Sequence, residues 1–202
     1  MNILHAIGNT SMVQLRKVVP PNCADIFVKL EWENPTGSLR DRRAHAVISR
    51  AEEDGRLKPG DTVIEYTGGS TGTSLALVCA AKGYPLQIVS SDAFSREKLD
   101  HMAALGAQLT IVPSEGGLTT KKLILDMIEA ARGLSQEPHT YWTDQLNNHD
   151  SIAGYYPVGR RNLESNQERD RRIRSLRGHG GFFAWRRDGP EALQTGRQDR
   201  RS

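Results

Sequence analysis

The sequence predicts an α/β fold in which a parallel sheet lies between two layers of helices. Short apolar runs alternate with segments of helical period up to about residue 159, which is the pattern of a parallel sheet covered by helices. Glycines follow several of the helical segments, where they can end a helix. A chain of 202 residues that is 37% hydrophobic is also long enough to bury a substantial core.

Five apolar runs have the length and composition of strands. The expected strands span residues 26–30, 62–66, 86–89, 108–112 and 139–142. The first helix is expected after a cap at Ser38, because apolar residues recur at positions i, i+3, i+4 and i+7 before Gly55. The other helices are expected over residues 73–82, 96–105 and 118–132.

A Thr-Gly-Gly-Ser-Thr-Gly sequence at residues 67–72 joins one of these strands to the helix at 73–82. Its glycines allow the backbone to approach a ligand closely, and its hydroxyls and the free N–H groups of the helix start suit a carboxylate or phosphate. A tight turn with a Ser or Thr cap accounts for the same spacing, so both interpretations stay open. The sequence is neither a Walker A loop nor a dinucleotide-binding loop.

Two further segments contain charged or amide side chains that could belong to a site. Residues 33–42 place Arg40 in the first turn of a helix, after a loop that contains Pro and Gly. On its own this pattern predicts a surface arginine paired with Asp41 or Glu33. Residues 144–148, Asp-Gln-Leu-Asn-Asn, follow a short strand and on their own predict side chains that cap a loop.

Composition excludes several classes of protein. No run approaches the roughly 20 apolar residues of a membrane-spanning helix, and the N-terminus has neither a basic start nor a long apolar run, so we expect a cytoplasmic protein. The six His residues have no metal-ligand spacing, so no metal site is expected. Cys23 and Cys79 are too few for a disulfide framework, and both are expected to be buried thiols.

The net charge of +3 is unevenly divided along the chain. Residues 160–202 hold 12 Arg, no Lys and 6 acidic residues, so the basic character belongs to this segment alone. It has little periodicity and few apolar residues, which predicts a mostly disordered tail. An alternative is a binding protein whose tail contacts nucleic acid or an acidic partner, but the tail has few aromatic residues and no nucleic-acid motif.

Several linked motifs occur in one order along the chain. They are Ile7–Thr10, Leu30–Glu31, Asn34–Ser38, Glu65–Gly72 and Gln145–Tyr156. Together they resemble the cysteine synthase family, meaning the O-acetylserine sulfhydrylases and the cystathionine β-synthase-like enzymes of pyridoxal phosphate (PLP) fold type II. The resemblance covers residues 1–159. It implies the tryptophan synthase β-like fold, with a second domain that is incomplete.

This resemblance implies a PLP-dependent β-replacement, in which sulfide replaces the acetate of O-acetylserine and cysteine is formed. At the matching positions, Thr67, Gly68, Ser70, Thr71 and Gln145 would hold the carboxylate of an amino-acid substrate. Ser70 would also lie near the phenolic oxygen of the cofactor. The family usually forms homodimers.

Three departures from the family pattern affect this expectation. Arg40 occupies the position of the family's Schiff-base Lys, and a guanidinium has a pKa above about 12 and offers no free amine to form an imine. Ser70 stands where the family usually has Asn. No sequence that matches the family's glycine-rich loop for the cofactor phosphate is found after residue 159. We therefore expect a truncated, inactive relative that does not bind PLP covalently and that partly aggregates or associates with an intact homologue.

A shift of reading frame would account for the change in amino-acid composition and periodicity near residue 160. Residues 161–167 can be written AGG AAT CTG GAA TCA AAC CAA, and the frame one nucleotide forward reads Gly-Ile-Trp-Asn-Gln-Thr. Residues 173–187 can similarly be written so that the shifted frame resembles the family's phosphate loop. Sequencing the gene across codons 158 to 162 tests this hypothesis.

Overall fold

The computed structural model describes residues 2–20, 25–165, 173–175 and 183–185. Its helices are η1 (Ile3–Ala6), η2 (Glu31–Glu33), α1 (Arg40–Glu53), α2 (Ser70–Lys82), α3 (Arg96–Ala104), α4 (Lys121–Leu134), α5 (Asp150–Ala153) and α6 (Tyr156–Ser165). Its strands are β1 (Met12–Leu15), β2 (Ile26–Lys29), β3 (Thr62–Tyr66), β4 (Leu86–Ser91), β5 (Gln108–Val112), β6 (Thr140–Trp142), β7 (Ile173–Ser175) and β8 (Phe183–Trp185).

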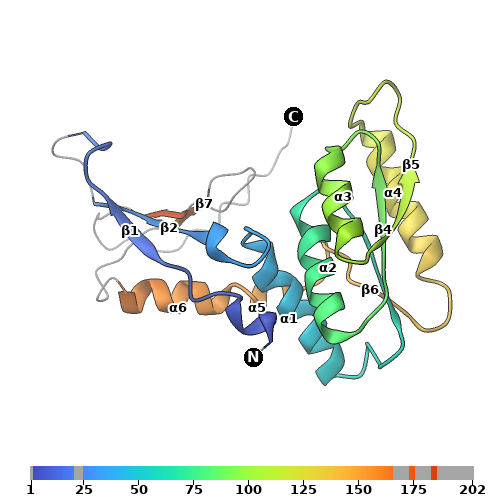
Figure 1. The fold of residues 1–202 in the computed structure, drawn as a ribbon, viewed down its shortest axis with the longest axis horizontal. Coiled ribbons are helices and arrows are strands. Elements are labelled where there is room, and N and C mark those ends of the chain that lie inside the picture. Colours follow the sequence, from blue (N-terminus) through green and yellow to red (C-terminus); the bar gives the residue numbers. More distant parts are fainter. Residues whose placement is uncertain (1, 21–24, 166–172, 176–182, 186–202) are drawn as a thin grey trace, which may run out of the picture.

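The expected three-layer parallel sheet is present. Its strands lie in the order β5-β4-β3-β6, and each neighbouring pair is parallel. Helices α2 and α3 pack on one face and α4 packs on the other (Figure 1). Neighbouring residues of β3 therefore face opposite layers, and both Val63 and Ile64 are fully buried. Burial on both faces explains why neighbouring residues of the central strands, such as Ile88 and Val89, are both apolar.

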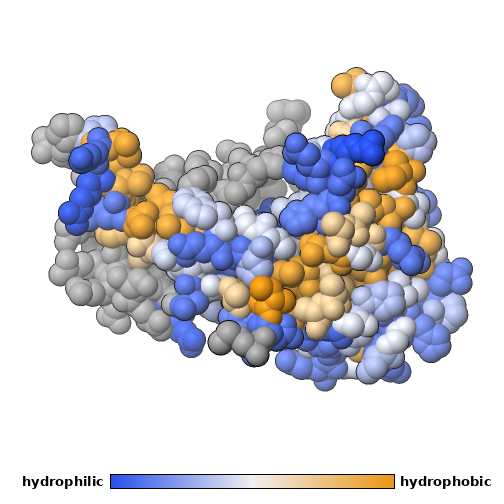
Figure 2. Space-filling view, in the orientation of Figure 1, coloured by the Kyte–Doolittle hydropathy of each residue, from blue (hydrophilic) through white to orange (hydrophobic). Residues whose placement is uncertain are grey.

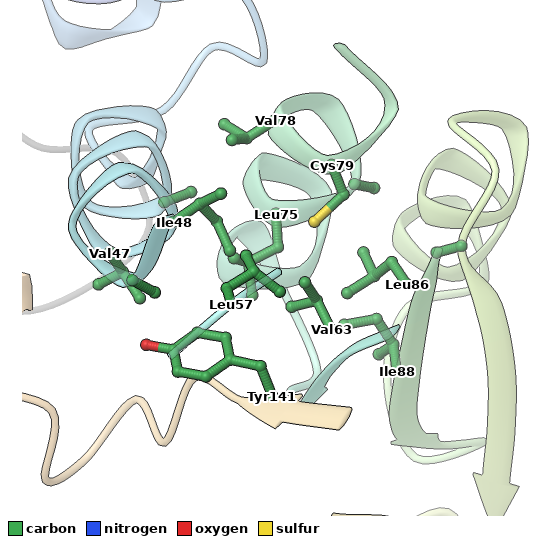
Figure 3. Close-up of a cluster of buried hydrophobic side chains, with 14 of the residues drawn as sticks. Val47, Ile48, Leu57, Val63, Leu75, Val78, Cys79, Leu86, Ile88 and Tyr141 are labelled. Atoms are coloured by element: carbon green, nitrogen blue, oxygen red, sulfur yellow. The ribbon is translucent and has the colours of Figure 1, made fainter. Parts of the chain in front are cut away.

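The larger core cluster lies between α1, α2 and the sheet, as Figure 3 shows. Ile48 of α1 and Leu75 of α2 meet side chains from the strands in this cluster. Burying each such side chain contributes about 1.5–3 kcal/mol. Cys79 lies in the same cluster, where burial raises the pKa of its thiol to about 12, so it is the buried, unreactive thiol that was predicted. Cys23 lies outside the described residues.

A second sheet contains the predicted strand at 26–30, which is β2 but lies outside the parallel sheet. Its strands are ordered β1-β2-β8-β7, and all neighbouring pairs are antiparallel. The sequence analysis did not predict β1, because this strand is short and has no buried residue to produce a pattern. Apolar side chains lie on the surface near β1, at the left of Figure 2, including Val13 and Val18.

The helix starts differ from the predicted ones for local reasons. Helix α2 begins at Ser70 rather than at residue 73, because part of the glycine-containing loop is itself helical. Helix α4 begins at Lys121 because the Thr120 hydroxyl accepts a hydrogen bond from the N–H of Leu123 at 3.1 Å. Leu39, rather than Ser38, is the N-cap residue of α1.

The predicted boundary at residue 159 falls inside α6, which continues to Ser165. Beyond α6, only the short strands β7 and β8 are described. The predictions of a disordered tail and of a tail that binds nucleic acid or an acidic partner therefore fall largely outside the described residues and stay predictions. None of the helices in the described part of the chain combines the length and apolarity needed to span a membrane.

Candidate active site

The candidate site lies at the edge of the parallel sheet where β3 and β6 both end. These strands are parallel neighbours, and Ile64 pairs with Trp142 in the register. The loop at residues 67–69 and the segment at 143–148 therefore leave the sheet side by side. This carboxyl edge is where open α/β sheets bind their ligands.

Gln145 is held beside the end of β3 by two hydrogen bonds. Its side-chain amide donates to the carbonyl oxygen of Tyr66 at 2.6 Å, and its backbone N–H donates to the Glu65 carboxylate at 2.9 Å. The structure thus brings Gln145 to the glycine-containing loop, although 79 residues separate it from Tyr66. The amides at 147 and 148 cap their own loop as predicted, since Asn147 donates to Asp144 at 3.0 Å.

The glycine-containing loop leads directly into the start of α2. The N–H of Gly69 donates to the Thr67 hydroxyl at 3.2 Å, and Thr67 and Thr71 are buried. Ser70 is exposed at the first position of α2, and Gly68 is half-buried beside it. The first N–H groups of a helix have no partner within the helix, and they carry partial positive charge. This arrangement suits a small anion such as a carboxylate.

Two glycines at this site allow α3 to pack closely against it. A Cβ on Gly68 would overlap the ring of Phe94, and a Cβ on Gly72 would overlap the Met102 side chain. Each glycine therefore has a steric reason to be present. The segment 94–102, which sequence analysis did not connect with the site, forms one of its walls.

Arg40 is exposed at the first position of α1. Its backbone N–H donates to the Ser38 hydroxyl at 3.1 Å. Arg40 lies on the surface as that pattern predicts, but no hydrogen bond or ion pair joins its guanidinium to Asp41 or Glu33 among the described residues; Glu33 instead accepts the N–H of Ser11 at 2.6 Å. Within the described part of the chain, no hydrogen bond or ion pair joins Arg40 to the residues of the glycine-containing loop or to Gln145.

Asp41 links the start of α1 to α2 and is fully buried. It accepts hydrogen bonds from the Ser74 hydroxyl at 2.5 Å and from the backbone N–H and the hydroxyl of Thr36. The loop before α1 and the first turns of both helices are therefore held together. These hydrogen bonds account for the burial of the Asp41 carboxylate next to the exposed Arg40.

Glu65 is a buried carboxylate directly beneath the site. It accepts hydrogen bonds from the N–H of Tyr66 at 2.8 Å, the Thr143 hydroxyl at 2.6 Å and the N–H of Gln145 at 2.9 Å. Burial raises the pKa of the Glu65 carboxyl, although these hydrogen bonds and the charge of Arg43 act in the opposite direction. Sequence analysis did not assign Glu65 or Thr143 a role, because their contact depends on the pairing of β3 with β6.

A second buried carboxylate, Glu31, organises the N-terminal motifs. The Arg42 guanidinium donates to both of its oxygens at 2.8 and 3.0 Å, and the Thr10 hydroxyl and Asn34 amide donate at 2.7 and 2.9 Å. Burial alone would raise the pKa of Glu31, but these hydrogen bonds and the charge of Arg42 hold it below its usual value. Asn34 also accepts the N–H of Gly8 at 2.8 Å, so the cluster joins three of the recognised motifs.

The fold and this edge define an α/β protein in which the start of a helix is placed where a small anion could bind. The chain matches the family described as "Pyridoxal-phosphate dependent enzyme" over residues 3–174, and it belongs to that family. The match continues past residue 159, where the recognised motifs end. The family confirms the predicted relationship and implies PLP as the family's cofactor.

Curated relatives are cysteine synthases. The chain is 43% identical to a cysteine synthase of Staphylococcus aureus over 144 residues, which cover 71% of this chain and 44% of the relative. It is 41% identical to cysteine synthase B of Salmonella typhimurium over 158 residues, which cover 77% of this chain and 50% of the relative. The chain thus spans about half the length of the curated relatives it matches.

Solved structures agree with the sequence relatives. A cysteine synthase (OASS) from Entamoeba histolytica matches with a TM-score of 0.76 and 32% identity, over 84% of this chain and 50% of that one. An O-ureido-L-serine synthase matches with a TM-score of 0.72 and 34% identity, over 81% and 50% of the two chains. These neighbours confirm the tryptophan synthase β-like fold, of which this chain covers a part.

The residues present fit only part of what PLP requires. The loop at 67–71 and Gln145 suit the carboxylate of an amino acid. Position 40 carries an exposed guanidinium, which has no amine that could form an imine with an aldehyde. The site therefore does not fit covalent attachment of the cofactor at this position. No cluster of metal-ligating side chains occurs in the described part of the chain.

Proposed function

We propose that this chain binds the α-carboxylate of a small amino acid of the O-acetylserine class and does not itself catalyse β-replacement. The carboxylate would lie at the start of α2, against Gly68, Ser70 and Thr71, with Gln145 beside it. The observation that carries the proposal is Arg40 at the first position of α1. The relatives' activity needs an amine that can exchange with the substrate, and a guanidinium cannot supply one.

The loop is better suited to binding than to covalent chemistry. Its contribution is the partial positive charge and the free N–H groups of a 13-residue helix, neither of which depends on position 40. Ser70 replaces the family's usual Asn with a hydroxyl, which can still donate a hydrogen bond to an anion. Binding of a substrate carboxylate is therefore compatible with the loss of the imine-forming residue.

Two measurements on the full chain test the two halves of this proposal. Titration with PLP, followed by absorbance and by borohydride reduction, is expected to give no imine at position 40, with or without O-acetylserine. Calorimetry is expected to show O-acetylserine binding that Thr71→Val weakens and that Ser11→Ala, on the exposed surface elsewhere, leaves unchanged. A yellow complex that forms cysteine from O-acetylserine and sulfide would overturn the proposal.

Arg40→Lys provides a matched chemical control. This variant restores an amine, but the tail contains no sequence that matches the family's cofactor phosphate loop. We therefore expect the variant to remain unable to form cysteine. Cysteine formation by Arg40→Lys alone would show that the rest of the catalytic site is intact. Sequencing of the gene across codons 158 to 162 separately tests the proposed shift of reading frame.

The proposed partners are a second copy of this chain or an intact homologue, and the proposed location is the cytoplasm. Support for a partner comes from the coverage of about half of each relative and from the exposed Val13 and Val18 near β1. Co-expression with a tagged cysteine synthase, followed by purification and size-exclusion chromatography, is expected to recover a complex. A chain that elutes alone as a monomer under these conditions would contradict this proposal.

A further inference from the structure

One face of the α3 segment lies against the glycine-containing loop. Phe94, just before α3, and Lys98 and Met102 within it are spaced four residues apart, which places them on the same side of a helix. Phe94 packs where a Cβ of Gly68 would be, and Met102, which is fully buried, packs where a Cβ of Gly72 would be. The residue between them is therefore also directed towards the loop.

The ammonium of Lys98 lies beside the loop at Gly69. Its Nζ lies 3.9 Å from the position of a Cβ on Gly69, the N-cap residue of α2. Lys98 is half-buried, and within the described part of the chain no carboxylate pairs with it. Arg96, on the outer side of α3, does have a carboxylate partner, since its Nε lies 3.6 Å from Oδ2 of Asp100.

A lysine at this place is electrostatically unfavourable in the absence of a ligand. The N-terminus of α2 already carries partial positive charge, and cations favour the opposite end of a helix. Two positive groups that converge on one loop raise the local potential and attract an anion. An anion held by the N–H groups at the start of α2 would be stabilised by both of them.

We propose that Lys98 is a further binding residue of this site, whose ammonium pairs with the carboxylate held at residues 68–71. This inference rests on the proposed function, because it assigns a second source of positive charge to the same carboxylate. The pair would be charge-assisted and partly shielded from water by the Phe94 ring. It would increase affinity for the carboxylate group without contacting the side chain of the amino acid.

The test is calorimetric titration of the full chain with O-acetylserine at low and at high salt. We expect Lys98→Met to weaken binding about threefold to tenfold at low salt. The unmodified chain should lose affinity as salt increases, whereas Lys98→Met should lose less, so the two affinities approach each other at high salt. Lys98→Arg should retain most of the affinity and the salt dependence. Thermal unfolding of each variant shows whether it is folded.

Lys121→Met is the matched control. Lys121 is an exposed lysine in the first turn of another long helix, α4, on the opposite face of the sheet. Its removal should change neither the affinity nor its dependence on salt. If Lys98→Met binds O-acetylserine as the unmodified chain does, with the same salt dependence, the role of Lys98 is overturned and the proposed function stands. If the unmodified chain does not bind O-acetylserine, both are overturned.

Discussion

Arg42 and Arg43 are neighbours in α1 and both are buried, yet their guanidinium groups have different surroundings. Arg42 forms two hydrogen bonds with the Glu31 carboxylate and a third with the Thr10 hydroxyl at 3.1 Å. Arg43 donates to the Ser151 hydroxyl at 2.8 Å, but its Nη2 has no acceptor within the described part of the chain. The first region is a complete polar cluster, and the second is an incomplete one.

The pKa values of the carboxylates in these two regions, Glu31 and Glu65, are shifted in opposite directions. Hydrogen bonds and the Arg42 charge hold the pKa of Glu31 below its usual value in spite of burial. Burial dominates at Glu65, which accepts only uncharged donors, so its pKa is raised. Burial also lowers the pKa of Arg43, with the charge of Glu65 acting in the opposite direction. An opposite charge in direct contact thus stabilises a buried charge more than an opposite charge at a distance does.

The largest expected effect comes from removing the paired arginine. Arg42→Met leaves the Glu31 carboxylate buried without its charged partner, and we expect the free energy of unfolding to fall by about 3–5 kcal/mol. Urea denaturation measures this change. Arg132→Met, which removes the exposed arginine next to Glu129, is the control and should cost less than about 1 kcal/mol. A comparable cost for both variants would contradict the comparison.

A steric change beside Arg42 should have the next largest effect. Gly154 of the segment between α5 and α6 packs against α1, and a Cβ there would lie 2.6 Å from the carbonyl oxygen of Arg42. Gly154→Ala is expected to cost about 1–3 kcal/mol, because backbone must move to admit the methyl group. Gly133→Ala, in α4 with open space around it, should instead be neutral or slightly stabilising in the same urea experiment.

Removal of the incompletely paired arginine should have the opposite sign. Arg43→Met replaces a buried guanidinium whose Nη2 lacks an acceptor with an apolar side chain of similar length, and we expect a gain of about 1 kcal/mol in unfolding free energy. An unchanged slope of unfolding free energy against urea would show that the gain reflects stability. A loss as large as that of Arg42→Met would mean that Glu65 depends on Arg43 as Glu31 depends on Arg42.

The smallest expected effect is on the pH dependence of stability, with opposite signs for the two carboxylates. Glu31 has a lowered pKa, so its contribution is present above the ordinary value of 4.5 and is lost as the pH falls through the folded-state pKa. Glu65 has a raised pKa, so its contribution is present below 4.5 and is lost as the pH rises through the folded-state pKa.

Two amide variants measure these slopes. Glu31→Gln should lose less stability than the unmodified chain as the pH falls below about 4.5. Glu65→Gln should lose less as the pH rises from that value. Urea denaturation at a series of pH values gives both slopes, and any constant offset from altered hydrogen bonds does not affect them. If the slope of unfolding free energy against pH changed with the same sign in both variants, the pKa values of Glu31 and Glu65 would not be shifted in opposite directions.

The parts of the site that could be predicted from sequence are those with a local cause. The apolar runs of β3 and β4 and the glycines that follow β3 are visible in the chain, and they place a turn and a helix start at one edge of the sheet. Gln145 was found only through resemblance to a family, because nothing near it in sequence indicates that β6 pairs with β3. The position of Lys98 beside Gly69 left no pattern, since it depends on how the α3 segment packs against the loop.

The amino-acid sequence by itself determined the central strands and the loop at 67–72, because each depends on residue type and local spacing, and its resemblance to the family implied the replacement of an amine by a guanidinium at position 40. Only the tertiary structure decided which of the two neighbouring arginines has a carboxylate partner. Adjacent residues on a helix point in different directions, so Arg42 meets Glu31 whereas Arg43 meets Ser151, 108 residues away. Partners at such a separation are selected by how the elements pack.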